Sequence, residues 1–135
     1  MKIVTLFSIV LFTVSAHAQN ICDEYITNEW PDSRYSIESI VGDNVVIDNN
    51  TKLMWKQCSE GLSGTGCIDG AVFTSNWKAV LDSAMALNND TGFAEFNDWR
   101  VPNIEELRSI ATLNCSNPAI NESVFPNTPP STYWS

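Results

Sequence analysis

The chain has 135 residues, of which 16 are acidic and 7 are basic, and its formal net charge is −9 at pH 7. This acidity argues against binding of nucleic acid or of an anionic membrane surface through net charge. The length suits one domain with a single core.

Residues 1–18 have the pattern of a secretory signal peptide. Lys2 precedes an apolar run over residues 3–14, and Ala16-His17-Ala18 offers small residues where a signal peptidase cuts. The run is too short to span a bilayer. We therefore expect cleavage after Ala18, a secreted or periplasmic protein, and no transmembrane segment. Cleavage leaves 117 residues, with six basic and sixteen acidic ones and a formal charge of −10.

The only histidine of the chain, His17, lies inside the predicted signal peptide. Its removal excludes Ser-His-Asp and Cys-His nucleophile pairs, histidine general bases and zinc sites that contain histidine. We therefore expect no enzymatic activity and no catalytic residue.

Four cysteines remain after cleavage: Cys22, Cys58, Cys67 and Cys115. An even number in an exported chain indicates disulfides, and three pairings are possible. Because a flexible, glycine-containing loop joins Cys58 to Cys67, we favour that pair, which leaves Cys22 with Cys115. The chain-entropy treatment gives roughly 2.5–3 kcal/mol for the short loop and ~5 kcal/mol for the long one. The alternatives are a four-cysteine zinc site and a redox-active pair, and both lack the usual two-residue spacing.

The first half of the mature chain predicts a small sheet. Residues 19–34 are polar and irregular, whereas residues 35–40 alternate as a short strand does. Residues 45–47 and 53–56 flank a turn rich in Asp and Asn, which predicts a hairpin. Residues 61–70 hold four of the six glycines, and we expect a loop closed by its cysteines.

A first helix is predicted over residues 77–87, because apolar residues there recur at helical spacing and give one face. Thr74 or Ser75 is the expected N-cap. Phe93 and Phe96 bracket a polar turn that follows.

A second helix is predicted after Asn103. Asn103 is the expected N-cap, and Glu106 can reach back to complete a capping box. Leu107, Ile110 and Leu113 are expected to face the core.

Several motifs follow one another from Asp48 to the end of the chain. They are Asp48 with Thr51-Lys52-Leu53-Met54-Trp55, the Cys58–Cys67 loop, Phe73-Thr74 before Trp77, Asp98-Trp99-Arg100-Val101-Pro102-Asn103 with Glu106-Leu107, Asn117-Pro118-Ala119-Ile120-Asn121, Phe125-Pro126, and Tyr133-Trp134-Ser135. In this series the chain resembles the Lcl C-terminal domain family, named for a bacterial collagen-like adhesin. Lys52 stands where the family usually has Gly. The resemblance implies a domain over residues 45–135, preceded by a signal peptide over 1–18 and by an N-terminal segment with the first strand over 19–44.

The resemblance implies an α+β fold, a variant of the C-type-lectin-like fold with two helices and a small antiparallel sheet. The family usually continues past Tyr133-Trp134-Ser135 with further strands, so we expect the domain to be truncated at its C-terminus. Members are typically exported bacterial proteins, and some are implicated in adhesion and in binding of glycans or host surfaces.

We therefore expect a non-enzymatic binding module whose partner is a glycan or an extracellular or envelope protein. One alternative is a structural or assembly module of the cell envelope without a small ligand. Another is an oxidoreductase like the formylglycine-generating enzymes, which share the lectin-like fold. That activity needs a reactive cysteine pair late in the domain, where only Cys115 lies.

The candidate ligand-binding residues are Tyr133, Trp134 and Arg100. The two aromatic residues lie in a polar segment, and aromatic faces stack on sugars. Arg100 is expected to bind backbone carbonyls or a carboxylate near Trp99, with anion binding as the alternative. Core packing is expected for three tryptophans. The structural motif comprises Trp55, Trp77, Trp99, Arg100, Pro102, Asn103 and Glu106.

Oxygen donors that could bind calcium cluster at residues 43–50 and 89–98, with Asp48 and Asp98 as candidate ligands. The chain has no EF-hand pattern. The sugar-site signature of C-type lectins is Glu-Pro-Asn or Gln-Pro-Asp. In Val101-Pro102-Asn103 a valine stands in place of the Glu or Gln. Turn formation explains these clusters, so we expect no cofactor and no bound metal, with calcium as the alternative.

Overall fold

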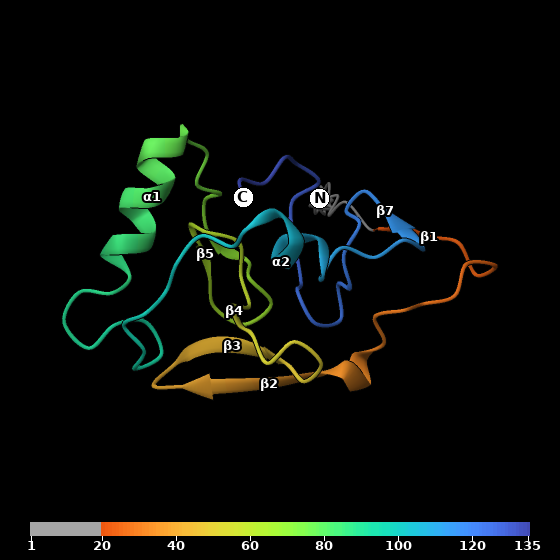
Figure 1. Ribbon diagram of the computed structural model, residues 1–135, viewed down its shortest axis with the longest axis horizontal. Helices are drawn as coiled ribbons and strands as arrows, with labels where there is room; N and C mark the ends of the chain where they lie inside the picture. Colours follow the sequence, from red (N-terminus) through yellow and green to blue (C-terminus); the bar gives the residue numbers. More distant parts are fainter. Residues whose placement is uncertain (1–19) are drawn as a thin grey trace, which may run out of the picture.

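The computed structural model describes residues 20–135, and the predicted signal peptide with its cleavage site lies outside them. Two helices and three small antiparallel sheets make the fold α+β (Figure 1). Among residues 20–135, no helix combines the length and the apolar character that crossing a membrane requires.

The main sheet has the order β2-β3-β4, with β2 at Tyr35–Ile40, β3 at Asp43–Asp48 and β4 at Met54–Lys56. Both pairings are antiparallel, so the predicted hairpin is confirmed. Val45 and Val46 of the middle strand are fully buried, as β-branched residues in a central strand tend to be. Lys52, in the turn between β3 and β4, has a φ of 63°. This left-handed conformation explains why glycine is usual at that position.

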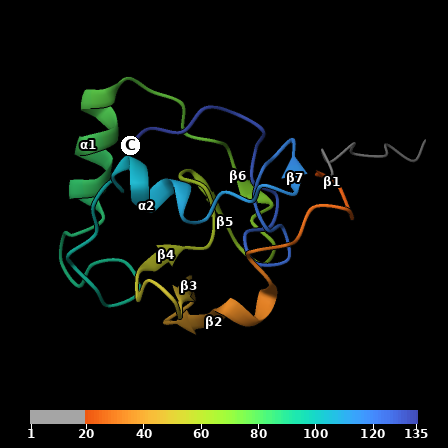
Figure 2. The ribbon, with the colours of Figure 1, turned by 45° about the vertical axis from the view of Figure 1, so that its right-hand side comes forward.

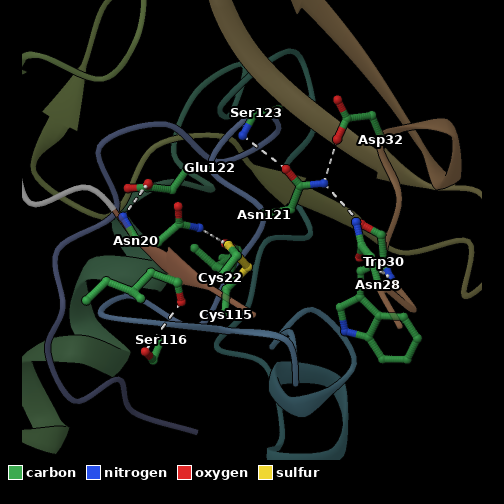
Figure 3. The surroundings of a disulfide bond; sticks show 12 residues. Asn20, Cys22, Asn28, Trp30, Asp32, Cys115, Ser116, Asn121, Glu122 and Ser123 are labelled. Carbon is green, nitrogen blue, oxygen red and sulfur yellow. Dashed lines mark hydrogen bonds between the residues drawn. A yellow bond between two sulfur atoms is a disulfide. The ribbon is translucent and has the colours of Figure 1, made fainter. Parts of the chain in front are cut away.

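The N-terminal segment is not irregular throughout, which corrects the prediction for residues 19–34. β1 (Ile21–Cys22) pairs with β7 (Cys115–Ser116), with Cys22 directly opposite Cys115, and η1 spans Asp32–Arg34. The disulfide between Cys22 and Cys115 crosses this pair of strands (Figure 3). A sequence pattern does not reveal such short strands, because their pairing joins residues far apart in the chain.

Asn121 and Asn20 fasten the N-terminal segment to the last third of the chain (Figure 3). Asn121 Nδ2 donates to the carbonyl of Trp30 at 3.0 Å and to a carboxylate oxygen of Asp32 at 2.7 Å. Asn20 donates through its backbone amide to Glu122 and through its side chain to the carbonyl of Ile120. The N-terminal segment is therefore an integral part of the fold.

The core lies between the main sheet and the later segments. It consists of Tyr35, Val46, Ile110, Val124 and Phe125, with Trp30, Trp55, Leu107 and Ile120 packed against it. These residues come from both sides of the predicted boundary between residues 44 and 45. One core therefore serves both segments.

A buried ion pair borders this core. Arg34 donates through Nε and Nη2 to the two carboxylate oxygens of Asp48, at 2.8 and 2.5 Å. Asp48 is fully buried, and it also accepts from the amide of Asn50 and the hydroxyl of Thr51. The Arg34 guanidinium lies 4.5 Å from the ring centroid of Trp30. These contacts tie the first segment to the end of β3.

The glycine-rich stretch, predicted as a loop closed by its cysteines, also contains a short two-stranded ribbon. β5 (Leu62–Ser63) pairs with β6 (Asp69–Gly70), and the Cys58–Cys67 disulfide closes the ribbon, as predicted. Gly61 has a φ of +87°, and a Cβ there would lie 2.1 Å from the carbonyl oxygen of Ala71. Only glycine permits this approach of the two chains.

α1 spans Trp77–Ala86 and lies at one edge of the molecule (Figures 1 and 2). Its N-cap is Asn76, which accepts from the amide of Ala79 at 3.1 Å, so the prediction of Thr74 or Ser75 is wrong. None of its residues is fully buried, so the predicted apolar face is not part of the core. The apolar residues form two rows, one half-buried and one exposed, because the helix touches the rest of the molecule along a narrow strip.

α2 spans Ile104–Arg108 and has the predicted capping box between Asn103 and Glu106. Ile110 is buried and Leu107 packs against the core. Leu113 is 73% exposed, so its predicted core position is wrong. The helix ends at Arg108, and the helical spacing that pointed Leu113 inward no longer applies.

Candidate functional site

Two tryptophan side chains meet at the edge of the molecule formed by the start of α1 and the C-terminal segment, and Tyr133 precedes one of them in the chain. Trp77 and Trp134 have ring centroids 6.0 Å apart at an interplanar angle of 52°. Trp77, Tyr133 and Trp134 are 41%, 40% and 51% exposed. We call these three residues the aromatic surface. The predicted candidates Tyr133 and Trp134 belong to it, and the prediction that Trp77 packs in the core is wrong.

The polar side-chain atoms of Tyr133 and Trp134 form hydrogen bonds within the protein. Trp134 Nε1 donates to the carbonyl of Ser75 at 3.0 Å. The Tyr133 hydroxyl donates to the carbonyl of Pro129 at 3.2 Å and lies 2.9 Å from the hydroxyl of Ser59. Partial burial raises the pKa of Tyr133, although the hydrogen bond with Ser59 acts in the opposite direction. The Tyr133 and Trp134 side chains are therefore held in place, and both residues stay 40–51% exposed.

The Cys58–Cys67 ribbon contacts the segment that carries Tyr133 and Trp134. Ser59 directly follows Cys58, so the disulfide limits where its hydroxyl can lie. Asn127 Nδ2 donates to the carbonyl of Gly66 at 2.6 Å, and the Gln57 amide donates to the carbonyl of Val124. These two hydrogen bonds join the ribbon to the C-terminal segment that carries Tyr133 and Trp134.

An exposed apolar row continues from the aromatic surface along α1. Trp77, Leu81 and Met85 follow one another at four-residue spacing and are 41%, 40% and 70% exposed. Residues four apart lie on the same side of a helix. Contiguous apolar area of this kind is typical of interaction surfaces. We call Leu81 and Met85 the apolar row.

Each cation near these residues is paired with a carboxylate. Lys78 Nζ lies 2.6 Å from Asp82, and Lys56 Nζ lies 2.6 Å from Glu60. Glu60 also accepts from the hydroxyl of Ser83 at 3.1 Å, which links β4 and the segment after it to α1. The surroundings of the aromatic surface are thus polar but carry no excess of positive charge.

Arg100 has the structural role predicted for it. Its guanidinium donates to both carboxylate oxygens of Glu106, at 2.8 and 2.5 Å, and to the carbonyl of Val101 at 3.4 Å. The hydrogen bond from Arg100, and next the one from the backbone amide of Asn103, lower the pKa of Glu106 to about 2. The same pairing raises the pKa of Arg100. Glu106 therefore occupies the two terminal nitrogens of the Arg100 guanidinium.

Trp55 and Trp99 are half-buried and pack against neighbouring side chains, in line with the packing role predicted for them. Trp55 lies against the core. Trp99 Nε1 donates to the carbonyl of Phe93 at 2.8 Å, and its ring meets Phe93 edge-on at 5.4 Å. The backbone amide of Trp99 donates to Asn88 Oδ1, and Asn88 Nδ2 donates to the backbone carbonyl of Trp99.

The structure argues against the suggested calcium ligand at Asp48. Each of its two carboxylate oxygens already accepts a hydrogen bond from Arg34. Burial alone would raise the pKa of Asp48, but hydrogen bonds from Arg34, Thr51 and Asn50 outweigh it and lower the pKa to about 2. Asp98 is exposed. In the part of the chain that the structure describes, no three His, Cys, Asp or Glu residues gather in a group that could hold a metal.

A second surface feature lies near β1 and β7, at the opposite side of the molecule from α1 (Figures 1 and 2). It is an open hollow of about 570 Å³ beside the Cys22–Cys115 disulfide, lined by residues 21–26 and 113–116. Tyr25 and Leu113 at its border are 91% and 73% exposed. No predicted ligand-binding residue lies there.

Sequence reasoning missed the residues that position the site. Ser59 could have been noticed as the neighbour of a bridged cysteine. Ser75 contributes only a backbone carbonyl, which leaves no signal in the sequence. Arg34 lies in a segment that looked irregular, and its partner Asp48 was interpreted as a turn residue.

The sequence model of the Lcl C-terminal domain matches residues 44–135, from the second position of β3 to the last residue. No curated protein and no solved structure matches the chain. The matched region contains both helices, the Cys58–Cys67 ribbon and the aromatic surface. The chain therefore belongs to the Lcl C-terminal domain family.

Proposed function

We propose that this protein is an exported, non-enzymatic binding module that recognises glycans through its aromatic surface. The observation that carries the proposal is the geometry of Trp77, Tyr133 and Trp134. The polar side-chain atoms of Tyr133 and Trp134 are engaged within the protein, whereas the three residues are 40–51% exposed. An aromatic face offers a flat apolar area on which the C–H face of a sugar ring can stack.

The fold and the covalent structure support an extracellular role. Family members are implicated in adhesion, and we propose that this α+β fold is a variant of the C-type-lectin-like fold. The two disulfides suit an oxidising compartment, which agrees with the predicted signal peptide at residues 1–18. We place the mature protein outside the cytoplasm, as a secreted or periplasmic protein.

The available chemical groups favour binding over catalysis. Residues 20–135 contain no histidine, and all four of their cysteines are in disulfides. Each of these disulfides joins two structural segments, which is a structural role. An oxidoreductase of the formylglycine-generating type would need a reactive cysteine pair in a site of its own.

The apolar row favours a second candidate, a structural or assembly module that binds another protein. Leu81 and Met85 are aliphatic, and aliphatic side chains on an exposed helix face are more typical of protein interfaces than of sugar sites. In that case Leu81 and Met85 would contribute as much to binding as the aromatic rings.

A glycan array tests the two candidates. The protein is applied as wild type and as the variants Trp134→Ala, Trp77→Ala and Leu81→Ala, with calcium and with a chelator. Tyr25→Ala, which removes a more exposed aromatic residue near the distant hollow, is the matched control. The proposal expects glycan binding that only the two tryptophan variants lose. Wild-type protein that binds no glycan, or binding that Tyr25→Ala abolishes instead, would overturn it.

A further inference from the structure

We propose that the aromatic surface selects neutral glycans and disfavours sulfated or sialylated ones. This inference rests on the proposed function and adds the chemical class of the ligand. Two independent observations lead to it: how the cations of the chain are paired, and which hydrogen-bonding groups the aromatic surface leaves free.

The cations of the described chain are almost all neutralised by carboxylates. Residues 20–135 contain six basic residues and sixteen acidic ones. The five ion pairs are Arg34–Asp48, Lys56–Glu60, Lys78–Asp82, Arg100–Glu106 and Arg108–Glu105. Within this part of the chain, Lys52 alone has no carboxylate at ion-pair distance. It lies in the turn between β3 and β4, on the other side of the molecule from the start of α1 (Figures 1 and 2).

Charge close to the site matters most, because screening limits electrostatic reach to about 8 Å at physiological ionic strength. Lys78, next to Trp77, is paired with Asp82, and Lys56 is paired with Glu60. The Lys78–Asp82 pair is exposed, so it is weak and its partners can separate. Even then each lysine comes with a carboxylate of its own. The neighbourhood therefore lacks the unpaired Arg or Lys that recognition of a sulfate or carboxylate requires.

The hydrogen-bond network leaves an acceptor at Ser59. The single hydroxyl proton of Tyr133 is donated to the carbonyl of Pro129. Ser59 must then donate its own proton to Tyr133, and the Ser59 oxygen keeps lone pairs that can accept. The indole N–H of Trp134 is likewise used, since it donates to the carbonyl of Ser75. The indole N–H of Trp77, a residue that is 41% exposed, has no partner among the described residues and is a free neutral donor.

These free groups match one kind of glycan. A sugar hydroxyl can donate to the Ser59 oxygen and can also accept from the Trp77 indole N–H. The oxygens of a sulfate or carboxylate can only accept, so they satisfy the indole but not Ser59. The sulfate or carboxylate oxygens of an acidic glycan could not donate to the Ser59 oxygen. The negative charge of such a glycan would also be repelled by the acidic protein. A neutral pyranose that stacks its apolar face on Trp77 or Trp134 can donate a hydroxyl proton to Ser59 and carries no charge to be repelled.

The test uses oligosaccharides in matched pairs, each neutral sugar beside its sialylated or sulfated form, such as N-acetyllactosamine and sialyl-N-acetyllactosamine. We expect each bound neutral glycan to exceed its acidic form by at least about tenfold in affinity. We also expect the affinity for neutral glycans to change little between about 50 and 500 mM salt, because no ion pair forms. Ser59→Ala should weaken neutral binding without changing the fold.

Charge variants separate the inference from the proposed function. Asp82→Lys adds positive charge beside Lys78 and should narrow the gap between neutral and acidic glycans. Glu24→Lys changes net charge equally but lies by the distant hollow, so it should leave the gap unchanged. Acidic glycans that bind as tightly as neutral ones, with a salt-sensitive affinity that Trp134→Ala abolishes, would overturn the inference and leave the proposed function standing. Binding to no glycan at all would overturn both.

Discussion

Removing one partner of the buried Arg34–Asp48 pair should destabilise the protein strongly. Arg34 and Asp48 are 7% and 0% exposed, and two hydrogen bonds of 2.8 and 2.5 Å join them. Asp48→Asn leaves a buried guanidinium without its counter-charge, and Arg34→Met leaves a buried carboxylate. Breaking a buried pair in this way costs about 3–5 kcal/mol.

The pH dependence gives a second estimate of the same interaction. The pKa of Asp48 is about 2 in the folded protein, against 3.8 for an unperturbed aspartate. This difference corresponds to about 2–3 kcal/mol of stability at neutral pH. Because the folded pKa is the lower one, the stabilisation is present above about pH 4 and is lost as the pH falls toward 2. Asp48→Asn has no such carboxylate, so its deficit against wild type should shrink over that range.

Urea unfolding of wild type, Asp48→Asn, Arg34→Met and the double variant Arg34→Met/Asp48→Leu provides the assay. The double variant removes both charges and should lose less than the sum of the two single variants. A single-variant loss below about 1 kcal/mol would refute the reasoning, since it would mean that the buried charge finds another partner. A deficit of Asp48→Asn that is equal at pH 7 and at about pH 3 would also refute it.

Three further predictions follow from the packing and the caps. Ile110→Ala should cost about 2–5 kcal/mol, while Leu113→Ala, at 73% exposure, should stay within about 0.5 kcal/mol, both measured by urea unfolding. Asn103→Ala removes the helix cap and should cost about 1 kcal/mol, seen as a lower midpoint in thermal melts followed by circular dichroism. Replacing Cys58 and Cys67 together by Ser should lose up to roughly 3 kcal/mol and weaken glycan affinity, because Ser59 is no longer held. Unchanged affinity in that variant would argue against the ribbon as support for the aromatic surface.

Features determined by neighbouring residues could be predicted from the sequence. The β3–β4 hairpin follows from a β-branched run and an Asp- and Asn-rich turn, and both pieces lie within a few residues of each other. The Asn103–Glu106 capping box is likewise local. The Cys58–Cys67 disulfide was predictable because a short flexible loop separates the two residues.

Features that depend on distant partners were missed or wrongly predicted. Helical spacing shows that Trp77 and Leu81 share an apolar side of α1, but it carries no information about what covers that side. The pairing of β1 with β7 and the contact of Arg34 with Asp48 both join residues far apart in the chain. The aromatic surface itself forms only because the C-terminal segment returns to the start of α1, which no local pattern encodes.

The most direct test of the central claim follows the five indole N–H signals of the protein by NMR while a bound neutral glycan is added. The account predicts that the signals of Trp77 and Trp134 shift and that those of Trp30, Trp55 and Trp99 stay in place. Shifts confined to Trp30, with Trp77 and Trp134 unmoved, would contradict the claim that the aromatic surface is the binding site.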